Sequence, residues 1–173
     1  MLKPEQKAYI NVAKELGVIY GDATKLPFEN SSMDLVYSCH TVEHLYEEDF
    51  LKFMSEADRV LKPDGVFRMV IPDLSLYVKK YLESGDADQF CEMLHMSDRK
   101  KSNFADKIAL LIFGNRKHKW MYDGASMKKY IEQHSKFNDV KILKPGETTI
   151  KGDPKINLRE YKGVSVYFEC RRR

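Results

Sequence analysis

Residues 33–73, MDLVYSCHTVEHLYEEDFLKFMSEADRVLKPDGVFRMVIPD, carry the pattern from which the fold follows. Met33–Ser38 and Gly65–Ile71 are short apolar runs, rich in β-branched or aromatic residues and bounded by turn residues, which predicts two buried strands. Between them, Glu47–Leu61 has apolar residues at helical spacing, begins with acidic residues and is stopped by Lys62-Pro-Asp-Gly65. Strand, helix and strand joined by short connections predict a right-handed crossover with the two strands parallel.

The rest of the chain continues the mixed α/β pattern. Helices are expected over Asp73–Leu82, Asp86–Met96, Ala105–Phe113 and Ser126–His134, and further strands over Val18–Tyr20, Val140–Leu143 and Val164–Cys170. No helical pattern separates the two late strands, so we expect them to form an antiparallel hairpin that closes a parallel sheet. Residues 1–17 are ambiguous. Pro4 and the spacing of Tyr9, Val12 and Leu16 favour a helix, whereas Tyr9–Val12 alone could be a strand.

Length and composition describe one ordinary globular domain, residues 1–173. The chain has 173 residues, of which 43% are hydrophobic and 32% charged, which excludes disordered and collagen-like classes. The net charge of +3 comes from Arg171–Arg173, so no nucleic-acid partner is expected. No apolar run approaches the roughly 18 residues of a membrane span, and no signal sequence is visible; we therefore expect no membrane contact and a cytoplasmic location.

Candidate ligand-binding residues follow the predicted strands. Asp22 follows Val18–Tyr20, His40 follows the strand that ends near Ser38, and Asp73 follows Ile71. The carboxyl ends of parallel strands are where ligands of open α/β folds bind, so we expect the three side chains at one end of a common sheet. For Asp22 the alternative is a turn residue that holds the following loop.

His40, Glu43 and His44 match H-x-x-E-H, a pattern in which two histidines on one helix bind zinc and the glutamate acts as a base. Here the pattern begins at a strand end, and no third ligand is recognisable downstream. We therefore predict no tight zinc site, with a zinc hydrolase as a remote alternative. The three cysteines are far apart and contain no C-x-x-C, so neither a disulfide framework nor a cysteine zinc site is expected.

Several motifs occur together in a characteristic order. They are Gly21-Asp-Ala-Thr-Lys-Leu-Pro-Phe28, Met33-Asp-Leu-Val-Tyr-Ser-Cys-His-Thr-Val-Glu-His-Leu45, Arg59-Val-Leu-Lys-Pro-Asp-Gly65, Val70-Ile-Pro-Asp73, His118-Lys-Trp-Met-Tyr-Asp123, Ile156-Asn-Leu-Arg159 and Ser165-Val-Tyr-Phe-Glu-Cys170. In this order they resemble the class I S-adenosylmethionine-dependent methyltransferases, from the third strand of that sheet onward. The later motifs are similar to a bacterial and archaeal branch often linked to surface-sugar biosynthesis.

The resemblance implies a truncated Rossmann-like sheet, S-adenosylmethionine as cofactor, and methyl transfer to a small-molecule or sugar-like acceptor. It implies roles for ten residues: Asp22 and Ala23 beside the adenine, Ser38, Cys39 and His40 beside the methionine part, Glu43, His118, Trp120 and Tyr122 toward the acceptor, and His40 or His44 as a base. For His118, Trp120 and Tyr122 the alternative is a packed aromatic corner. Residues 85–121 would be a helical insertion on the acceptor side.

One family hallmark does not occur in this sequence. No G-x-G precedes Gly21, so the first strand with its glycine-rich turn and the acidic end of the second strand have no counterpart. In the family's strand order 3-2-1-4-5-7-6, a sheet without strands 1 and 2 has only part of the cofactor site and one strand edge without a neighbour. We expect a homodimer or a partner chain at that edge, or residues 1–17 folded over it. The alternative function is a non-catalytic remnant that acts as a binding or assembly module.

Overall fold

The computed structural model describes residues 15, 17–19, 21–96 and 117–173. Its elements in chain order are β1 (Met33–Cys39), the 3-10 helix η1 (Val42–His44), α2 (Glu47–Val60), β2 (Leu61–Pro72), α3 (Leu74–Ser84), α4 (Ala87–Met93), α6 (Gly124–His134), β3 (Asn138–Leu143) and β4 (Ser165–Arg171). The helix predicted over Ala105–Phe113 and the pattern over Tyr9–Val12 lie outside the described residues. None of the described helices is long and apolar enough to cross a membrane.

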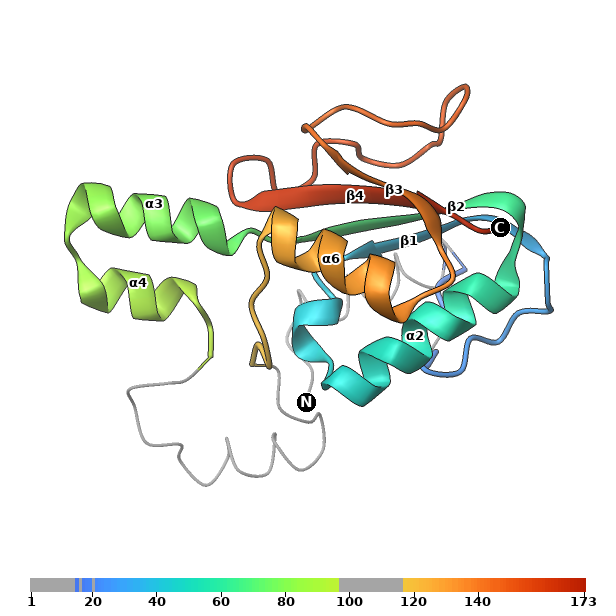
Figure 1. Ribbon diagram of the computed structural model, residues 1–173, viewed down its shortest axis with the longest axis horizontal. Helices are drawn as coiled ribbons and strands as arrows, with labels where there is room; N and C mark the ends of the chain where they lie inside the picture. Colours follow the sequence, from blue (N-terminus) through green and yellow to red (C-terminus); the bar gives the residue numbers. More distant parts are fainter. Residues whose placement is uncertain (1–14, 16, 20, 97–116) are drawn as a thin grey trace.

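The sheet has the order β1-β2-β4-β3 (Figure 1). β1 and β2 are parallel, with Leu35 opposite Val66, and helix α2 connects them as the sequence pattern predicts. β4 runs antiparallel to both β2 and β3, which confirms the C-terminal hairpin. In the order expected from the resemblance, the four strands take the positions 4-5-7-6. The fold is therefore the expected Rossmann-like α/β sheet, with a parallel pair at one side and an antiparallel hairpin at the other.

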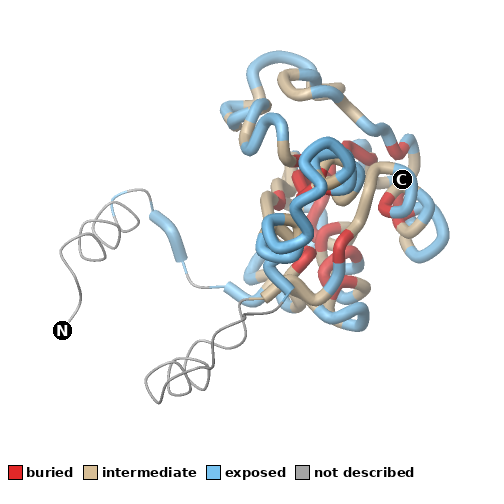
Figure 2. The backbone as a smooth tube through the Cα atoms, turned by 90° about the vertical axis from the view of Figure 1, so that its left-hand side faces the viewer, coloured by how far each residue is buried: buried red, intermediate tan, exposed pale blue. Residues whose placement is uncertain are grey.

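Helices α2 and α6 cover one face of this sheet (Figure 1), and the buried residues gather in the interior of the molecule (Figure 2). Five apolar residues of α2 are buried, as their spacing predicts, namely Phe50, Phe53, Met54, Ala57 and Val60, and Leu51 is partly buried. They pack with alternate residues of β2 and β4 and with α6 in one core, whose members include Phe50, Phe53, Met54, Ala57, Phe67, Met69, Ile71, Met127, Ile131, Val166, Phe168 and Cys170. Burial of this apolar surface, at about 25 cal/mol per Å², is the main stabilising contribution to the fold.

The opposite face of the sheet is covered by the irregular loop 144–164 (Figure 1). Arg68 of β2 points into this face, where it pairs with Glu169 of β4 and donates to the carbonyl of Glu147. Thr148 and Thr149 donate to the same carboxylate. The loop itself supplies these hydrogen bonds to the buried charged groups. It can therefore cover this face of the sheet although it contains no helix.

The ends of several elements follow local sequence signals. Asp73 and Asp86 cap α3 and α4, each accepting from a backbone N–H of the first turn. β2 begins earlier than predicted, at Leu61, because Leu61 already pairs with Met33 of β1. Gly65 is required within this strand, since a Cβ there would lie 2.8 Å from the carbonyl oxygen of Lys62.

The predicted strand at Val18–Tyr20 is wrong for the residues that the structure describes. Residues 17–19 and 21 lie outside any strand, and Val18 and Ile19 are 61% and 63% exposed. A short apolar run forms a strand only where another strand pairs with it, and the described part of the chain offers none here. Asp22 consequently follows no strand and forms only an isolated bridge with Lys25. His40 and Asp73, in contrast, do lie at the same edge of the sheet, because β1 and β2 are parallel.

Candidate active site

His40 stands at the carboxyl end of β1 with a left-handed backbone, φ 47°. Its backbone N–H donates to the carbonyl of Val70 at 2.9 Å, which holds the end of β1 against β2. The ring stacks on Tyr161 with 4.0 Å between centroids, and its Nε2 lies 2.8 Å from Ser165 Oγ. Burial lowers the pKa of His40 below its usual value of 6.5. At neutral pH the ring is therefore an uncharged imidazole with a lone pair, as a base requires.

Glu43 lies in η1, next to His40, and its side chain is only 1% exposed. Neither carboxylate oxygen has a hydrogen-bond partner among the described residues. Oε1 lies 3.7 Å from His40 Nδ1 and 3.9 Å from His44 Nε2. Burial raises the pKa of Glu43 to about 7. A carboxyl group held in this way is typical of functional sites.

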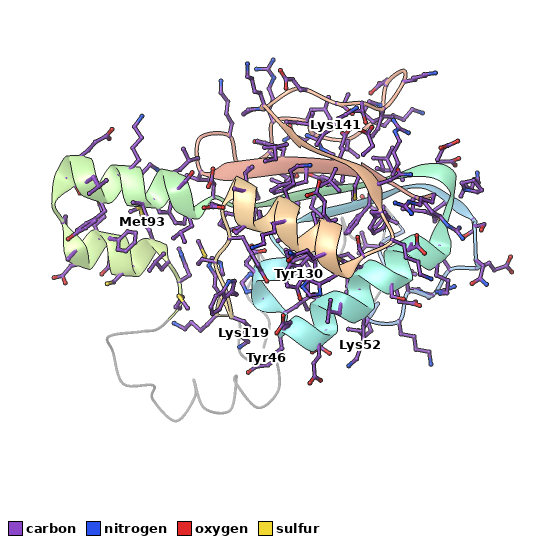
Figure 3. The ribbon with its side chains drawn as sticks, in the orientation of Figure 1. Tyr46, Lys52, Met93, Lys119, Tyr130 and Lys141 are labelled. Carbon is purple, nitrogen blue, oxygen red and sulfur yellow. The ribbon has the colours of Figure 1, made fainter. Side chains whose placement is uncertain are left out.

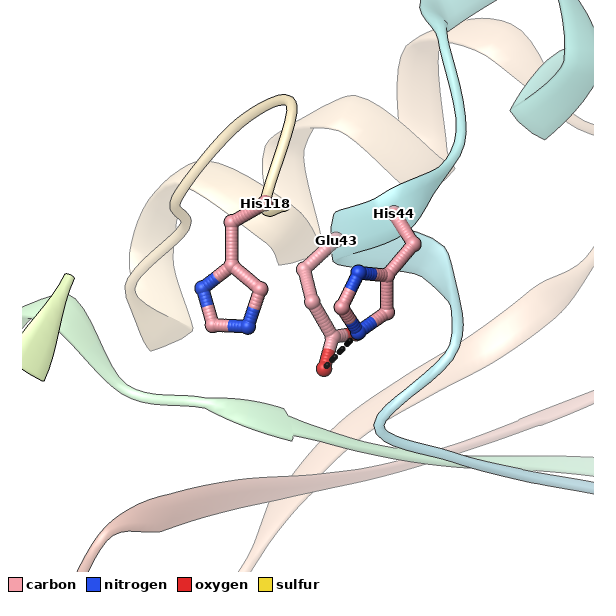
Figure 4. Close-up of side chains that lie close together, drawn as sticks. All are labelled: Glu43, His44 and His118. Atoms are coloured by element: carbon pink, nitrogen blue, oxygen red, sulfur yellow. Dashed lines mark ion pairs between the residues drawn. The ribbon is translucent and has the colours of Figure 1, made fainter. Parts of the chain in front are cut away.

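His118 reaches the same place from the segment before α6 (Figure 4). The backbone N–H groups of Lys119 and Trp120 donate to the carbonyl of Glu43 at 2.6 and 3.4 Å, which joins this segment to η1. The rings of His118 and His44 meet edge to face with 4.9 Å between centroids. Burial, and then the neighbouring His44, lowers the pKa of His118 to about 4.

An open pocket of about 380 Å³ is formed in part by the residues that directly follow His44 and His118 in the chain. It is lined by Leu45, Tyr46, Glu47, Lys119, Trp120, Tyr122 and Tyr130. Trp120 and Tyr46 are 62% and 65% exposed, so their rings remain available to a ligand. Figure 3 shows Tyr46 and Lys119 close together, and Lys119 Nζ lies 5.0 Å from the centre of the Tyr46 ring. The aromatic walls and the cationic rim suit a small ligand with both flat and polar parts.

The residues predicted to face the cofactor fall into two groups. Ser38, Cys39 and His40 follow one another at the end of β1; Ser38 is buried and Cys39 is half-buried, with its pKa raised to about 11 by burial. Asp22 stands apart, beside Lys25 and near Lys52 of α2. Hydrogen bonds from Thr24 lower the pKa of Asp22, so it is an ionised turn residue.

Of the residues predicted to face the acceptor, the structure brings Glu43 and His118 together with His44, and it places Trp120 and Tyr122 in the pocket. Trp120 is too exposed for the packed-corner alternative, whereas Tyr122 does pack against the core. Ser165 and Tyr161, which hold His40, and Tyr46 and Tyr130 in the pocket were not predicted as site residues. No local pattern assigns them to a site, because their roles come from contacts with distant segments.

Comparison with known proteins agrees with this fold. A family model described as "Methyltransferase domain" matches residues 1–69. The sterol 4-C-methyltransferase strm-1 of Caenorhabditis elegans is 33% identical over 63 residues, which are 36% of this chain and 18% of that protein. A Mycolicibacterium smegmatis protein named "Probable S-adenosylmethionine-dependent methyltransferase" is 37% identical over 54 residues, 31% of this chain and 20% of that protein. The matching segments thus span about a fifth of these curated relatives.

Two solved structures share the fold over nearly the whole chain. A protein from Pyrococcus horikoshii OT3 superposes with a TM-score of 0.51 at 16% identity, covering 96% of this chain and 66% of that one. A Thermotoga maritima S-adenosylmethionine-dependent methyltransferase, described as a possible histamine N-methyltransferase, gives 0.52 at 14% identity, covering 95% and 68%. At these identities the likeness concerns the fold alone.

The sheet order and the polar edge of β1 and β2 define a Rossmann-like methyltransferase fold. The sequence match over residues 1–69 adds that this part of the chain is similar to the methyltransferase domain family, in agreement with the resemblance of its motifs.

Proposed function

We propose that this chain takes part in methyl transfer from S-adenosylmethionine to a small-molecule acceptor, with a sugar-like compound as one class. The observation that carries the proposal is the meeting, at the carboxyl edge of the parallel pair, of His40, the buried Glu43 and the aromatic pocket around Trp120. In open α/β sheets this edge is the place where ligands bind.

The cofactor would supply a methyl group activated by its sulfonium. Ser38, Cys39 and His40 would line its methionine part, and Asp22 with Ala23 would bind the adenine. The structure supports the role of Asp22 in one respect. Thr24 N and Oγ1 both donate to Oδ1 at 2.8 Å, which leaves Oδ2 of the ionised carboxylate to accept from an exocyclic amine.

On the acceptor side, Trp120 and Tyr122 would orient the acceptor against the aromatic wall, beside Glu43 and His118. His40 or His44 would take the proton from the acceptor hydroxyl or amine. His40 suits this role because it is neutral at pH 7 and is held in place by Ser165 and Tyr161. Most of the rate enhancement would then come from proximity and orientation of the reactants.

Calorimetric titration with S-adenosylhomocysteine tests the cofactor part. We expect saturable 1:1 binding, and Asp22→Ala should weaken it by about tenfold or more, the effect of losing one charge-assisted hydrogen bond. Thr24→Val is the matched control, because it disturbs the same turn and keeps the carboxylate; its affinity should stay close to that of the parent chain. No binding by the parent chain would refute the proposal.

The second candidate is a non-catalytic binding or assembly module. It is favoured by the edge of β1, which has a neighbouring strand on one side only within the described part of the chain, and by the exposure of Val18 and Ile19. Light scattering and the calorimetric titration together separate the two functions. A stable dimer without affinity for S-adenosylhomocysteine supports the module, and a homodimer that binds it supports the enzyme.

A further inference from the structure

We propose that Glu43, His44 and His118 form a binding site for a divalent transition-metal ion, with Zn²⁺ as the best match. One ligand atom of each residue lies within 4.8 Å of the other two. Figure 4 shows the three side chains approaching one another from η1 and from the segment before α6. Two imidazoles and one carboxylate are the protein ligands of many catalytic zinc sites, in which water or substrate takes the remaining position.

The state of Glu43 is an independent indication that a cation belongs here. Its side chain is 1% exposed, and both oxygens are buried without a hydrogen-bond partner in the part of the chain that the structure describes. A buried carboxylate without partners is costly, and such groups are normally paired or bound to a metal. The groups that face Oε1 are the imidazoles of His40 and His44, at 3.7 and 3.9 Å. Metal coordination would satisfy the carboxylate and use the imidazole lone pairs together.

The ring nitrogens are arranged for this purpose. His44 Nδ1 lies 3.4 Å from the carbonyl oxygen of Lys117, and a carbonyl only accepts, so Nδ1 carries the proton and Nε2 keeps its lone pair on the side of Glu43. His118 Nδ1 contacts Met121 Sδ at 3.2 Å, so we assign Nε2 as its ligand atom. Hydrogen bonds from the outer nitrogen of a metal-bound histidine to a backbone carbonyl are common in metal sites.

The backbone holds the ligands close, and small side-chain movements complete the site. The hydrogen bond from Lys119 N to the carbonyl of Glu43, at 2.6 Å, fixes the segment that carries His118 beside η1. Ligand bonds of about 2.0 to 2.1 Å in a tetrahedron place the ligand atoms roughly 3.3 Å apart, so each pair must close by about 1.5 Å or less. The ring of His44 is 35% exposed, which gives an ion a path from solvent.

This proposal differs from the expectation drawn from the H-x-x-E-H pattern. That pattern pairs His40 with His44 and offers no third ligand, whereas the structure supplies His118 from a distant part of the chain. His40 remains close enough to Glu43 to serve as a further ligand or as its hydrogen-bond partner. The metal site does not depend on the proposed methyl transfer, because metal binding is measured without any cofactor.

The test is a competition titration with Zn²⁺ against a chromophoric chelator, using the full chain after removal of metals. We expect one equivalent to bind with a sub-micromolar dissociation constant. Glu43→Gln and His118→Gln should each weaken binding at least tenfold, since each removes one ligand. His134→Gln is the matched control, because it removes a histidine of α6 outside the cluster and should leave the affinity unchanged. With Co²⁺ in place of zinc, the visible absorption should show the intensity typical of four-coordinate sites.

Less than one equivalent of zinc in the parent chain, or equal weakening by His134→Gln, would overturn the proposal. Thermal unfolding in the presence of a chelator shows whether each variant folds. Glu43→Gln replaces a charge with a neutral amide of the same shape, so it should be as stable as the parent chain without metal, and a loss of zinc binding by this folded variant supports the site. Titration with S-adenosylhomocysteine of the same samples separates failure of the metal site from failure of the proposed function.

Discussion

Arg68 of β2 and Glu169 of β4 form an ion pair that is fully enclosed by protein. Their Nη1 and Oε1 atoms are 2.5 Å apart, and the side chains are 0% and 1% exposed. Thr148, Thr149 and the carbonyl of Glu147 supply further hydrogen bonds, and Arg68 Nε is buried without a partner among the described residues. The pair joins the central two strands to the loop that leads to Tyr161, so the packing of this sheet face also positions a residue of the site.

Removal of one member of this ion pair should destabilise the folded state far more than removal of both. Glu169→Gln leaves the guanidinium buried without a counter-charge, and we expect the free energy of unfolding to fall by about 3 to 5 kcal/mol. A double variant, Arg68→Met with Glu169→Met, should recover most of this loss because no buried charge remains. Urea unfolding followed by circular dichroism measures both. Equal destabilisation by the single and the double variant would contradict the prediction.

The stabilisation from the same ion pair should depend on pH and should be lost in acid. Burial raises the pKa of Glu169, but hydrogen bonds from Thr149, Thr148 and Arg68 outweigh it, and the net pKa is below 4.5. The folded state therefore binds fewer protons than the unfolded state just below pH 4.5, so this stabilisation is present above pH 4.5 and is lost as the pH falls through the folded-state pKa. Comparing the parent chain with Glu169→Gln should show a stability difference that shrinks on acidification. A difference that is constant from neutral pH to pH 3 would argue against it.

The hydrogen bond between His40 and Ser165 should appear as coupling between two distant positions. In a cycle of His40→Ala, Ser165→Ala and the double variant, we expect a coupling free energy of about 1 kcal/mol in unfolding measurements. The cycle cancels the separate effect of placing alanine at the left-handed backbone of residue 40. Additive single effects would mean that the two side chains do not interact in solution.

The three cysteines should react with iodoacetamide in a fixed order. Cys91 is exposed, whereas burial raises the pKa of Cys39 to about 11 and that of Cys170 to about 12. The thiolate is the reactive form, so Cys91 should be modified first, Cys39 more slowly and Cys170 only on unfolding. Mass spectrometry of peptides taken over time measures this. Because Cys39 lies where the cofactor is proposed to bind, S-adenosylhomocysteine should slow its modification without affecting Cys91.

Trp120 should report on the occupancy of the pocket. It is the single tryptophan of the chain and is 62% exposed, so its emission should be that of a hydrated indole and should be readily quenched by acrylamide. A small molecule that binds in the pocket should shift the emission to shorter wavelengths and protect it from quenching. Trp120→Phe serves as the control for signals from elsewhere. Emission of a buried indole in the ligand-free chain would contradict the described conformation.

The sequence by itself determined the β-α-β unit, the buried face of α2 and the C-terminal hairpin. These features depend on local periodicity and on capping residues such as Asp73, which act within a few residues along the chain. The place of His40 at the edge of the sheet was predictable for the same reason, because it directly follows a strand. The strand predicted at Val18–Tyr20 was wrong for the described residues Val18 and Ile19, because a strand also needs a partner, which local sequence does not specify.

Only the tertiary structure decided which residues meet. His118 and Glu43 come together because the segment before α6 hydrogen-bonds to the backbone of η1, and Arg68 meets Glu169 because β4 inserts between β2 and β3. The sequence placed His40 and His44 in one motif but could not identify His118 as the third member of the cluster around Glu43. Contacts of this kind depend on the path of the whole chain through the sheet, and no periodicity or spacing near either residue encodes that path.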